Sequence, residues 1–327
     1  MLAITATAYG TPDVLTLDTV AEPTVGARDV LVQVIASGIT RGDTRLRAAD
    51  YPGPLVIAGR LFSGVLRPRH RVPGTTFAGR VVAIGRHVTE FAPGDDVFGL
   101  AMHGAHAERL VISADKGIAH MPRGVAHADI ATLAYGATSA CYFVDELGDT
   151  SPGEHVVVIG AGGGVGRYAV QIALARGARV TAICSPRHHA LMRQLGVHAI
   201  VEPNAPIAGP IDVVLDTSGT SSLGAWSDRL VDNGRFVTTD LSARLALDLF
   251  LGMFRSGPKA RTGVAEDTGT RLGVVRDLID AGHLTPLRAA TFDLRDIANA
   301  HTFAERERPS GDVVVRVSSL TPAMVAA

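Results

Sequence analysis

A dense run of glycines marks the first place in the chain where chemistry can be expected. Five of the seven residues from 160 to 166 are glycine, and they follow the apolar residues 156–159. Glycine costs backbone entropy, so such a run is typical of a loop that lets a phosphate approach the backbone. The loop spells A-x-G-x-x-G before a helical pattern, which predicts a dinucleotide site; the alternative is a ligand-free tight turn. We expect these loop residues to contact the pyrophosphate: Gly160, Ala161, Gly163, Gly164, Val165 and Gly166.

The end of the next predicted strand indicates which nicotinamide cofactor binds. A carboxylate there would accept the ribose hydroxyls of NADH and would repel the extra phosphate of NADPH. The strand at 179–184 is followed instead by Ser185 and Arg187, and a guanidinium suits a phosphate. We therefore predict NADPH, with Ser185 and Arg187 beside its phosphate. The alternative is that Arg187 only begins the next helix, exposed to water.

Two different patterns of elements surround these residues. Residues 2–121 alternate short β-rich segments with turns, and residues 126–147 have the apolar spacing of a linking helix. Residues 155–240 then alternate strands and helices, with one helix expected at 225–234, which is typical of a doubly wound α/β domain with a parallel sheet. The last predicted strand, within 311–317, is similar to those of the first module, so we expect the chain to return there.

The composition excludes several function classes. The chain of 327 residues has a formal net charge of -1, 46% hydrophobic and 19% charged residues. These values indicate a globular protein with a small-molecule substrate and with neither a nucleic acid nor a membrane as partner. The basic run at 67–71 is interpreted as a solvated loop without a role.

Two cysteines, Cys141 and Cys184, lie in apolar stretches without metal-ligand spacing. They indicate buried free thiols in a reducing compartment, the cytoplasm. The sequence also has no signal-peptide pattern and no uninterrupted apolar run of ~18 residues.

Several longer motifs carry a resemblance to a known family. They include AYGTPDVLTL, DVLVQVIASGI, PGTTFAGRVVAIG, PGDDVFGL, GAGGGVGRYAVQIA and AHTFAER. The chain resembles the medium-chain dehydrogenases/reductases, in particular the zinc-free quinone oxidoreductase-like branch, and GVLRPRHRVPGTTFAGRV is similar to the reticulon-interacting sub-branch. The resemblance implies a GroES-like β-barrel catalytic domain at 1–122, with 262–327 returning to it, a Rossmann domain at 123–261, and a homodimer.

The resemblance also locates the positions where related alcohol dehydrogenases hold a catalytic zinc. The matching residues are Thr40, Thr75 and Tyr135, which are poor zinc ligands, and no four-cysteine lobe follows PGDDVFGL. We therefore predict no metal. A cluster of His103, His106 and Glu108 is interpreted as structural or pocket-lining, with metal binding as the alternative.

Further site residues follow from the same resemblance. Tyr51, in DYPGP, matches a proposed proton donor of enoyl reductases, and Thr40 keeps a hydroxyl where relatives carry Asn; we name both as catalytic candidates, against shielding or packing roles. Thr138 and Thr217 match positions near the nicotinamide amide and the ribose. Asp43 is expected to pair with Arg45 or Arg47, or to cap a short helix.

These features predict a metal-independent NADPH-dependent reductase of conjugated carbonyls or quinones, since hydrogen bonds must then polarise the substrate. The alternatives are a protein that retains the cofactor but binds a ligand or partner, and a non-redox cyclase or lyase on the same fold.

Overall fold

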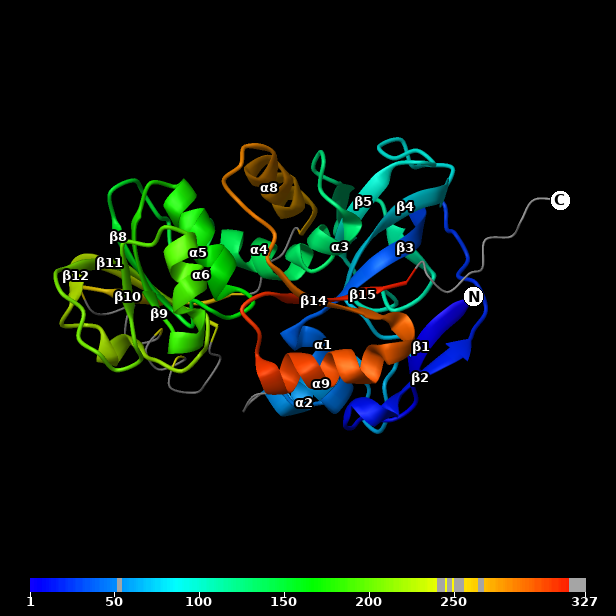
Figure 1. The fold of residues 1–327 in the computed structure, drawn as a ribbon, viewed down its shortest axis with the longest axis horizontal. Coiled ribbons are helices and arrows are strands. Elements are labelled where there is room, and N and C mark those ends of the chain that lie inside the picture. Colours follow the sequence, from blue (N-terminus) through cyan, green and yellow to red (C-terminus); the bar gives the residue numbers. More distant parts are fainter. Residues whose placement is uncertain (52–54, 240–244, 246–248, 250–255, 264–267, 318–327) are drawn as a thin grey trace.

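The computed structural model describes residues 1–327 except 52–54, 240–244, 246–248, 250–255, 264–267 and 318–327. Two bodies lie side by side, one around each of two larger sheets, with helices between them (Figure 1). The strands are β1 (Leu2–Ala6), β2 (Leu15–Thr19), β3 (Asp29–Ile39), β4 (Thr76–Ile84), β5 (Asp96–Leu100), β6 (Arg109–Ser113), β7 (Ile118–His120), β8 (His155–Ile159), β9 (Arg179–Ile183), β10 (Ala199–Val201), β11 (Ile211–Asp216), β12 (Leu230–Thr238), β13 (Lys259–Arg261), β14 (Arg288–Asp293) and β15 (Asp312–Arg316).

The α-helices are mostly short, and several short 3-10 or π-helical turns lie between the regular elements. The α-helices are α1 (Arg41–Ala48), α2 (Leu55–Ser63), α3 (His127–Ile130), α4 (Leu133–Cys141), α5 (Gly166–Ala175), α6 (His189–Gln194), α8 (Thr268–Asp280) and α9 (Ile297–Glu307). A π-helical turn at Tyr142–Leu147 continues α4, and 3-10 turns occupy Pro12–Val14, Pro186–His188, Leu223–Ala225 and Leu294–Asp296.

The first body is built on a seven-stranded sheet in the order β14-β15-β3-β4-β5-β7, with β6 also paired to β3. Strand β15 runs antiparallel to β3 and parallel to β14, so the C-terminal part of the chain returns to this sheet as the sequence predicts. The core on this sheet joins both ends of the chain, for example Ile4, Phe77, Val97, Leu294 and Val315. The limits at 122 and 261 stay a prediction.

The second body has a six-stranded, fully parallel sheet in the order β10-β9-β8-β11-β12-β13. The strands are apolar on both faces, as a sheet covered on both sides requires. Chain order reverses between β8 and β11, and in such sheets ligands bind beside the carboxyl ends of the strands at this switch point. The predicted doubly wound domain is confirmed.

The two bodies share a core around α4. This helix packs against α5 and α8, and α8 also packs against β7 of the first sheet. The shared core contains residues from both sheets, including Phe98 on β5 and Val158 on β8. The linking helix predicted at 126–147 exists as three successive helical pieces instead of one.

The prediction of a helix at 225–234 is wrong. Only a 3-10 turn forms at Leu223–Ala225, and β12 begins at Leu230. The reason lies just before it, where the Asp216 carboxylate accepts amide hydrogen bonds from Ser218, Gly219 and Ser221 and draws the chain into a tight turn. Little chain remains for a helix before the strand must start.

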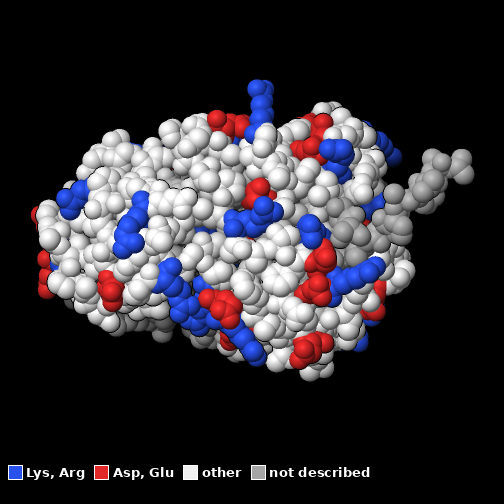
Figure 2. Space-filling view, viewed as in Figure 1, with Lys and Arg blue, Asp and Glu red and all other residues white. Residues whose placement is uncertain are grey.

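Surface and interior agree with an ordinary globular protein. Charges of both signs are interspersed on the face in Figure 2. Cys141 and Cys184 are buried free thiols, as predicted, and burial raises the pKa of Cys141 to about 12. Within the described part of the chain, no helix has the length and apolar character needed to cross a bilayer.

Candidate functional site

The glycine loop forms the turn from β8 into α5 at the switch point of the parallel sheet. Gly160 has a φ of 75°, a left-handed conformation that favours glycine. The amides of Gly160 and Ala161 donate to the carbonyl of Ile183 on β9, at 3.0 and 3.1 Å. The amide of Gly163 donates to the Gly160 carbonyl at 2.8 Å, so the loop is tightly curled before the helix begins.

The glycines of this loop serve two different purposes. A Cβ on Gly162 would lie 2.2 Å from the His188 ring, and one on Gly166 would lie 2.2 Å from the Gly160 carbonyl oxygen. Packing therefore requires both. Gly164, in contrast, is exposed, and no atom of the described residues lies within 4 Å of the position its Cβ would take. Neither packing nor backbone strain requires glycine there, whereas a phosphate resting against the loop would.

The carboxyl end of β11 borders the same loop. The Thr217 hydroxyl donates to the Ile159 carbonyl at 2.8 Å, which places Thr217 beside the start of the glycine turn. Its expected contact with the ribose stays a prediction. Asp216, buried at the end of β11, holds the following turn through the amides described above. Sequence reasoning missed this role, although an acidic residue ending an apolar strand before TSGTS was a usable signal.

Ser185 and Arg187 follow β9, next to the loop. Arg187 is exposed, and its Nη1 donates to the carbonyl of Glu307 at the end of α9, at 3.2 Å. His188 packs its ring on Gly162, and its Nδ1 lies 2.6 Å from the Ser310 hydroxyl. The segment predicted to hold the cofactor phosphate is thus attached to the first body as well as to the glycine loop.

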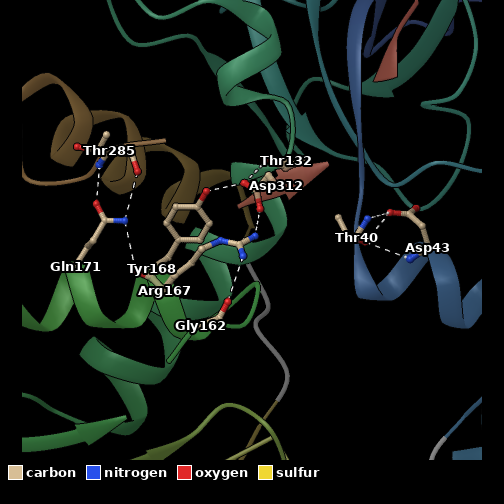
Figure 3. Close-up of polar contacts among 9 residues, drawn as sticks. All are labelled: Thr40, Asp43, Thr132, Gly162, Arg167, Tyr168, Gln171, Thr285 and Asp312. Atoms are coloured by element: carbon tan, nitrogen blue, oxygen red, sulfur yellow. Dashed lines mark hydrogen bonds and ion pairs between the residues drawn. The ribbon is translucent and has the colours of Figure 1, made fainter. Parts of the chain in front are cut away.

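A buried ion pair ties the two bodies together directly behind the loop. Arg167, in the first turn of α5, pairs with Asp312 on β15 and places its Nη1 3.5 Å from the Gly162 carbonyl (Figure 3). Asp312 also accepts the Tyr168 and Thr132 hydroxyls at 2.6 and 2.5 Å. Burial opposes the charge on Arg167, but the adjacent Asp312 holds its pKa above the usual value. We call this set of residues the Arg167–Asp312 network.

The two catalytic candidates lie at opposite ends of α1. Thr40 is the N-cap of the helix, where its hydroxyl donates to the Asp43 carboxylate at 2.5 Å and accepts from the Asp43 amide at 3.2 Å. Asp43 therefore takes part in capping α1, one of the two roles expected for it. Arg47, one of the two arginines expected to pair with Asp43, pairs with Glu305 instead. The Tyr51 hydroxyl is buried and has no hydrogen-bond partner among the described residues. Among the described residues, therefore, no hydrogen bond joins the Tyr51 hydroxyl to Thr40.

Comparison with known families matches the two halves of the chain in order. Residues 26–123 match the alcohol dehydrogenase GroES-like domain, and residues 193–315 match the zinc-binding dehydrogenase family. A mouse protein described as "NAD(P)H oxidoreductase RTN4IP1, mitochondrial" is 28% identical over 279 residues, covering 75% of this chain and 70% of the relative. The chain belongs to the medium-chain dehydrogenase/reductase superfamily.

Solved structures of other superfamily proteins have the same two-body architecture. A quinone oxidoreductase from Coxiella burnetii superposes with a TM-score of 0.84 at 23% identity, over 97% of this chain and 99% of that one. A cobalt- and zinc-bound thermostable alcohol dehydrogenase from Pyrobaculum aerophilum superposes with a TM-score of 0.78 at 26% identity, over 96% and 99% of the two chains. The GroES-like first domain and Rossmann-like second domain are therefore confirmed.

Thr40, Thr75 and Tyr135, the residues that the sequence resemblance matches to the metal positions of alcohol dehydrogenases, carry hydroxyl side chains. Thr40 and Tyr135 are neighbours, since a Cβ on Gly42 would lie 3.3 Å from Thr40 Oγ1 and 3.5 Å from the Tyr135 ring. Burial raises the pKa of the Tyr135 phenol, which disfavours the anionic form that a metal would need. Thr75 is buried, and its hydroxyl has no hydrogen-bond partner within the described residues.

The side chains of His103, His106 and Glu108 have three separate partners. His103 stacks on His70 with ring centroids 3.6 Å apart, and His106 is buried with its Nδ1 2.8 Å from the Ser37 hydroxyl. Glu108 accepts the Leu2 amide at 2.7 Å. Among the described residues, no three His, Cys, Asp or Glu side chains are grouped so that they could hold a metal ion.

Thr138 lies on α4, buried in the shared core. Its hydroxyl donates to the Ala134 carbonyl of its own helix. The hydroxyl is therefore occupied within the helix, and its expected contact with the nicotinamide amide stays a prediction.

Proposed function

We propose that this protein is an NADPH-dependent oxidoreductase that transfers hydride to a conjugated carbonyl compound or a quinone. One observation carries the proposal: the exposed Gly164 leaves an open space at the start of α5, beside the switch point of a parallel sheet. Backbone amides and the helix dipole favour an anionic phosphate at such a place. The mouse relative, which is named as an NAD(P)H oxidoreductase, supports the same class.

The preference for NADPH follows from the segment after β9. It offers the Ser185 hydroxyl and the Arg187 guanidinium, and no carboxylate follows β9 before the next helix. A phosphate is attracted by the guanidinium, whereas the ribose hydroxyls of NADH gain no carboxylate acceptor. When bound, NADPH would supply the hydride.

The residues of the chain would then bind the substrate and complete the reduction with a proton. With hydroxyls at the superfamily's metal positions, the substrate oxygen must be polarised by hydrogen bonds, which suits conjugated acceptors whose charge is delocalised. The Tyr51 hydroxyl, which has no hydrogen-bond partner among the described residues, is our candidate proton donor. Thr40 is less free, because its hydroxyl proton is directed to Asp43. Because a carbonyl or quinone oxygen can only accept, Thr40 would bind the substrate only by redirecting this hydroxyl proton from Asp43 to the substrate oxygen.

Independence of zinc is part of the proposal and can be measured directly. Neutral hydroxyls are poor zinc ligands, so we expect purified protein to contain less than stoichiometric zinc and to keep its activity after dialysis against a chelator. One tightly bound zinc per chain, with activity lost on its removal, would contradict the reading of Thr40, Thr75 and Tyr135.

The proposed activity is tested by following NADPH absorbance with a panel of enones, enals and quinones. Consumption with at least one acceptor is expected, and Tyr51→Phe should reduce turnover while leaving the affinity for NADPH unchanged. If calorimetry shows NADPH binding but no acceptor consumes it, the alternatives of a ligand-binding or non-redox role replace reduction. If neither NADPH nor NADH binds, the cofactor assignment itself is refuted.

Three further expectations stay predictions. A homodimer is proposed from the resemblance alone, and a small-molecule substrate from the charge balance. The cytoplasm is proposed from the two free thiols, although the mouse relative is named as a mitochondrial protein.

A further inference from the structure

An unusual concentration of exposed apolar side chains lies on α2 and the turn that follows it. Of nine large apolar side chains that are exposed among the described residues, six lie between positions 56 and 66. Ile57 is 74% exposed and Leu66 is 91% exposed; the others are Val56, Leu61, Phe62 and Val65. Single exposed apolar residues need no explanation, but a contiguous group marks an interaction surface. We call these six residues the α2 apolar face.

Contacts on the opposite side of α2 fix the orientation of the helix. Gly59 packs so closely on the Tyr51 ring that a Cβ would lie 2.4 Å from its Cγ. Ser63, one turn later, has its hydroxyl 3.0 Å from the Tyr9 hydroxyl, and the Arg60 guanidinium lies 4.7 Å from the Tyr9 ring centroid. Helical geometry places Ile57 on the side opposite to Gly59. The helix cannot turn its apolar side inward without losing all of these contacts.

Basic side chains adjoin the α2 apolar face, and no acidic residue accompanies them in sequence. Between Tyr51 and Thr89 the chain contains no Asp or Glu. Arg67, Arg69 and Arg71 are all exposed. Arg69 reaches back so that its Nη2 lies 3.4 Å from the Leu61 carbonyl, which brings a guanidinium beside the apolar side chains. The net charge of the whole chain conceals this local excess of positive charge.

This combination defines the chemistry of the partner, which must be both apolar and anionic. A second copy of the same face is disfavoured, because it would bring the arginines together. The exposed apolar side chains are aliphatic or phenyl groups without hydrogen-bonding atoms, and the charges sit on flexible stems. Such a surface matches a fluid interface of acyl chains and anionic headgroups better than the fixed donors and acceptors of a folded protein.

We propose that the α2 apolar face and its adjoining arginines bind the surface of an anionic lipid bilayer. The helix lies in the interface, with Ile57, Leu61 and Phe62 among the acyl chains and Arg67, Arg69 and Arg71 at the headgroups. Peripheral binding of this kind needs neither a membrane span nor a positive net charge. The proposal therefore replaces two expectations from the sequence, namely that no membrane is a partner and that the basic run at 67–71 has no role. Binding through this face also holds the segment that carries Tyr51 close to the lipid, where apolar molecules accumulate.

The test is co-sedimentation of the full chain with vesicles, in the absence of cofactor and substrate. The native protein is expected to bind vesicles of phosphatidylcholine with phosphatidylglycerol and to bind pure phosphatidylcholine at least tenfold less, with binding weakened by salt. Because the assay needs no catalysis, its failure is distinct from failure of the proposed reductase activity. A native protein that stays in the supernatant with both vesicle types would overturn the proposal.

Substitutions on the apolar side distinguish the lipid from other occupants. Ile57→Ser with Leu61→Ser should reduce vesicle binding roughly tenfold or more, since insertion depends on buried apolar area. Val82→Ser, at a residue 37% exposed on β4, is the control and should have no effect. If the pair instead changes the oligomeric state in sedimentation velocity and leaves vesicle binding unaltered, the face joins two copies and the lipid proposal is wrong.

The charge contribution has its own matched set. Arg67→Gln, Arg69→Gln and Arg71→Gln are each expected to weaken binding to anionic vesicles by roughly fivefold. Arg193→Gln and Arg229→Gln, also at exposed arginines but on the second domain, should leave it unchanged. Equal effects of both sets would show a general charge effect and would refute a specific surface.

Discussion

Removing the negative charge of Asp312 should lower the free energy of unfolding more than removing the charge of a comparable carboxylate near the surface. Asp312 and Arg167 expose only 9% and 6% of their side chains. Asp312→Asn keeps the shape of the side chain and an oxygen for the Thr132 and Tyr168 hydroxyls, but it leaves a buried guanidinium without a counter-charge. The Arg167 Nε already has no hydrogen-bond partner within the described residues. No other acceptor among them therefore compensates the guanidinium when the Asp312 charge is removed.

The expected cost is about 3–5 kcal/mol in the free energy of unfolding, the usual penalty for breaking a buried pair by removing one partner. Asp145→Asn is the control, because Asp145 also binds an arginine through two bonds, to Arg176 at 2.8 and 2.9 Å. That pair is about one third exposed, at 33% and 27%, so its loss should cost no more than about 1 kcal/mol.

Urea unfolding followed by circular dichroism measures both values. Adding Arg167→Met to Asp312→Asn should restore part of the stability, because the uncompensated cation is then removed. The reasoning is refuted if Asp312→Asn is as mild as Asp145→Asn, or if the double variant is less stable than either single one.

Three further outcomes are expected. Gly164→Ala should weaken NADPH binding without changing the unfolding free energy, whereas Gly162→Ala, whose Cβ would meet the His188 ring at 2.2 Å, should destabilise the fold by about 1–3 kcal/mol. Arg187→Ala should raise the KM for NADPH at least about tenfold more than that for NADH; equal changes would place the phosphate elsewhere. Burial lowers the pKa of His106 and, more strongly, of His301. The unfolded chain therefore takes up protons below about pH 6.5 that the folded chain refuses, so stability is complete above that pH and declines below it by up to about 1.4 kcal/mol per unit for each histidine. His301→Asn should flatten this decline in denaturation experiments between pH 7 and 5, and an unchanged slope would contradict the assignment.

Local patterns were sufficient to predict most of the strands and the glycine turn. The predicted strand at 155–160 and the glycines after it depend on neighbouring residues only, and β8 and its turn form there. The error at 225–234 has a different origin, because the Asp216 carboxylate organises the preceding turn through three amides. Helical spacing of apolar residues carries no information about such a turn.

The site includes contacts that no local pattern could reveal. Arg167 and Asp312 are 145 positions apart in the chain, and each alone resembles an ordinary charged residue beside an apolar run. Likewise, the residues of α2 have the composition of a buried segment, and only the contacts of Gly59 and Ser63 show which side faces inward. Pairing across the chain depends on tertiary packing, which a single sequence does not specify.

The return of β15 to β3 sets the order in which a growing chain can complete its domains. One edge of β3 is shared: Asp29–Gln33 pair with β6, and Ala36–Ile39 pair with β15. During synthesis the second half of that edge stays open until residues 313–316 leave the ribosome, while the parallel sheet, contiguous in sequence, can already assemble. The nascent protein thus carries an unpaired strand edge for most of its translation. During this period the open edge can pair with strands of other chains unless a chaperone or another part of the chain covers it.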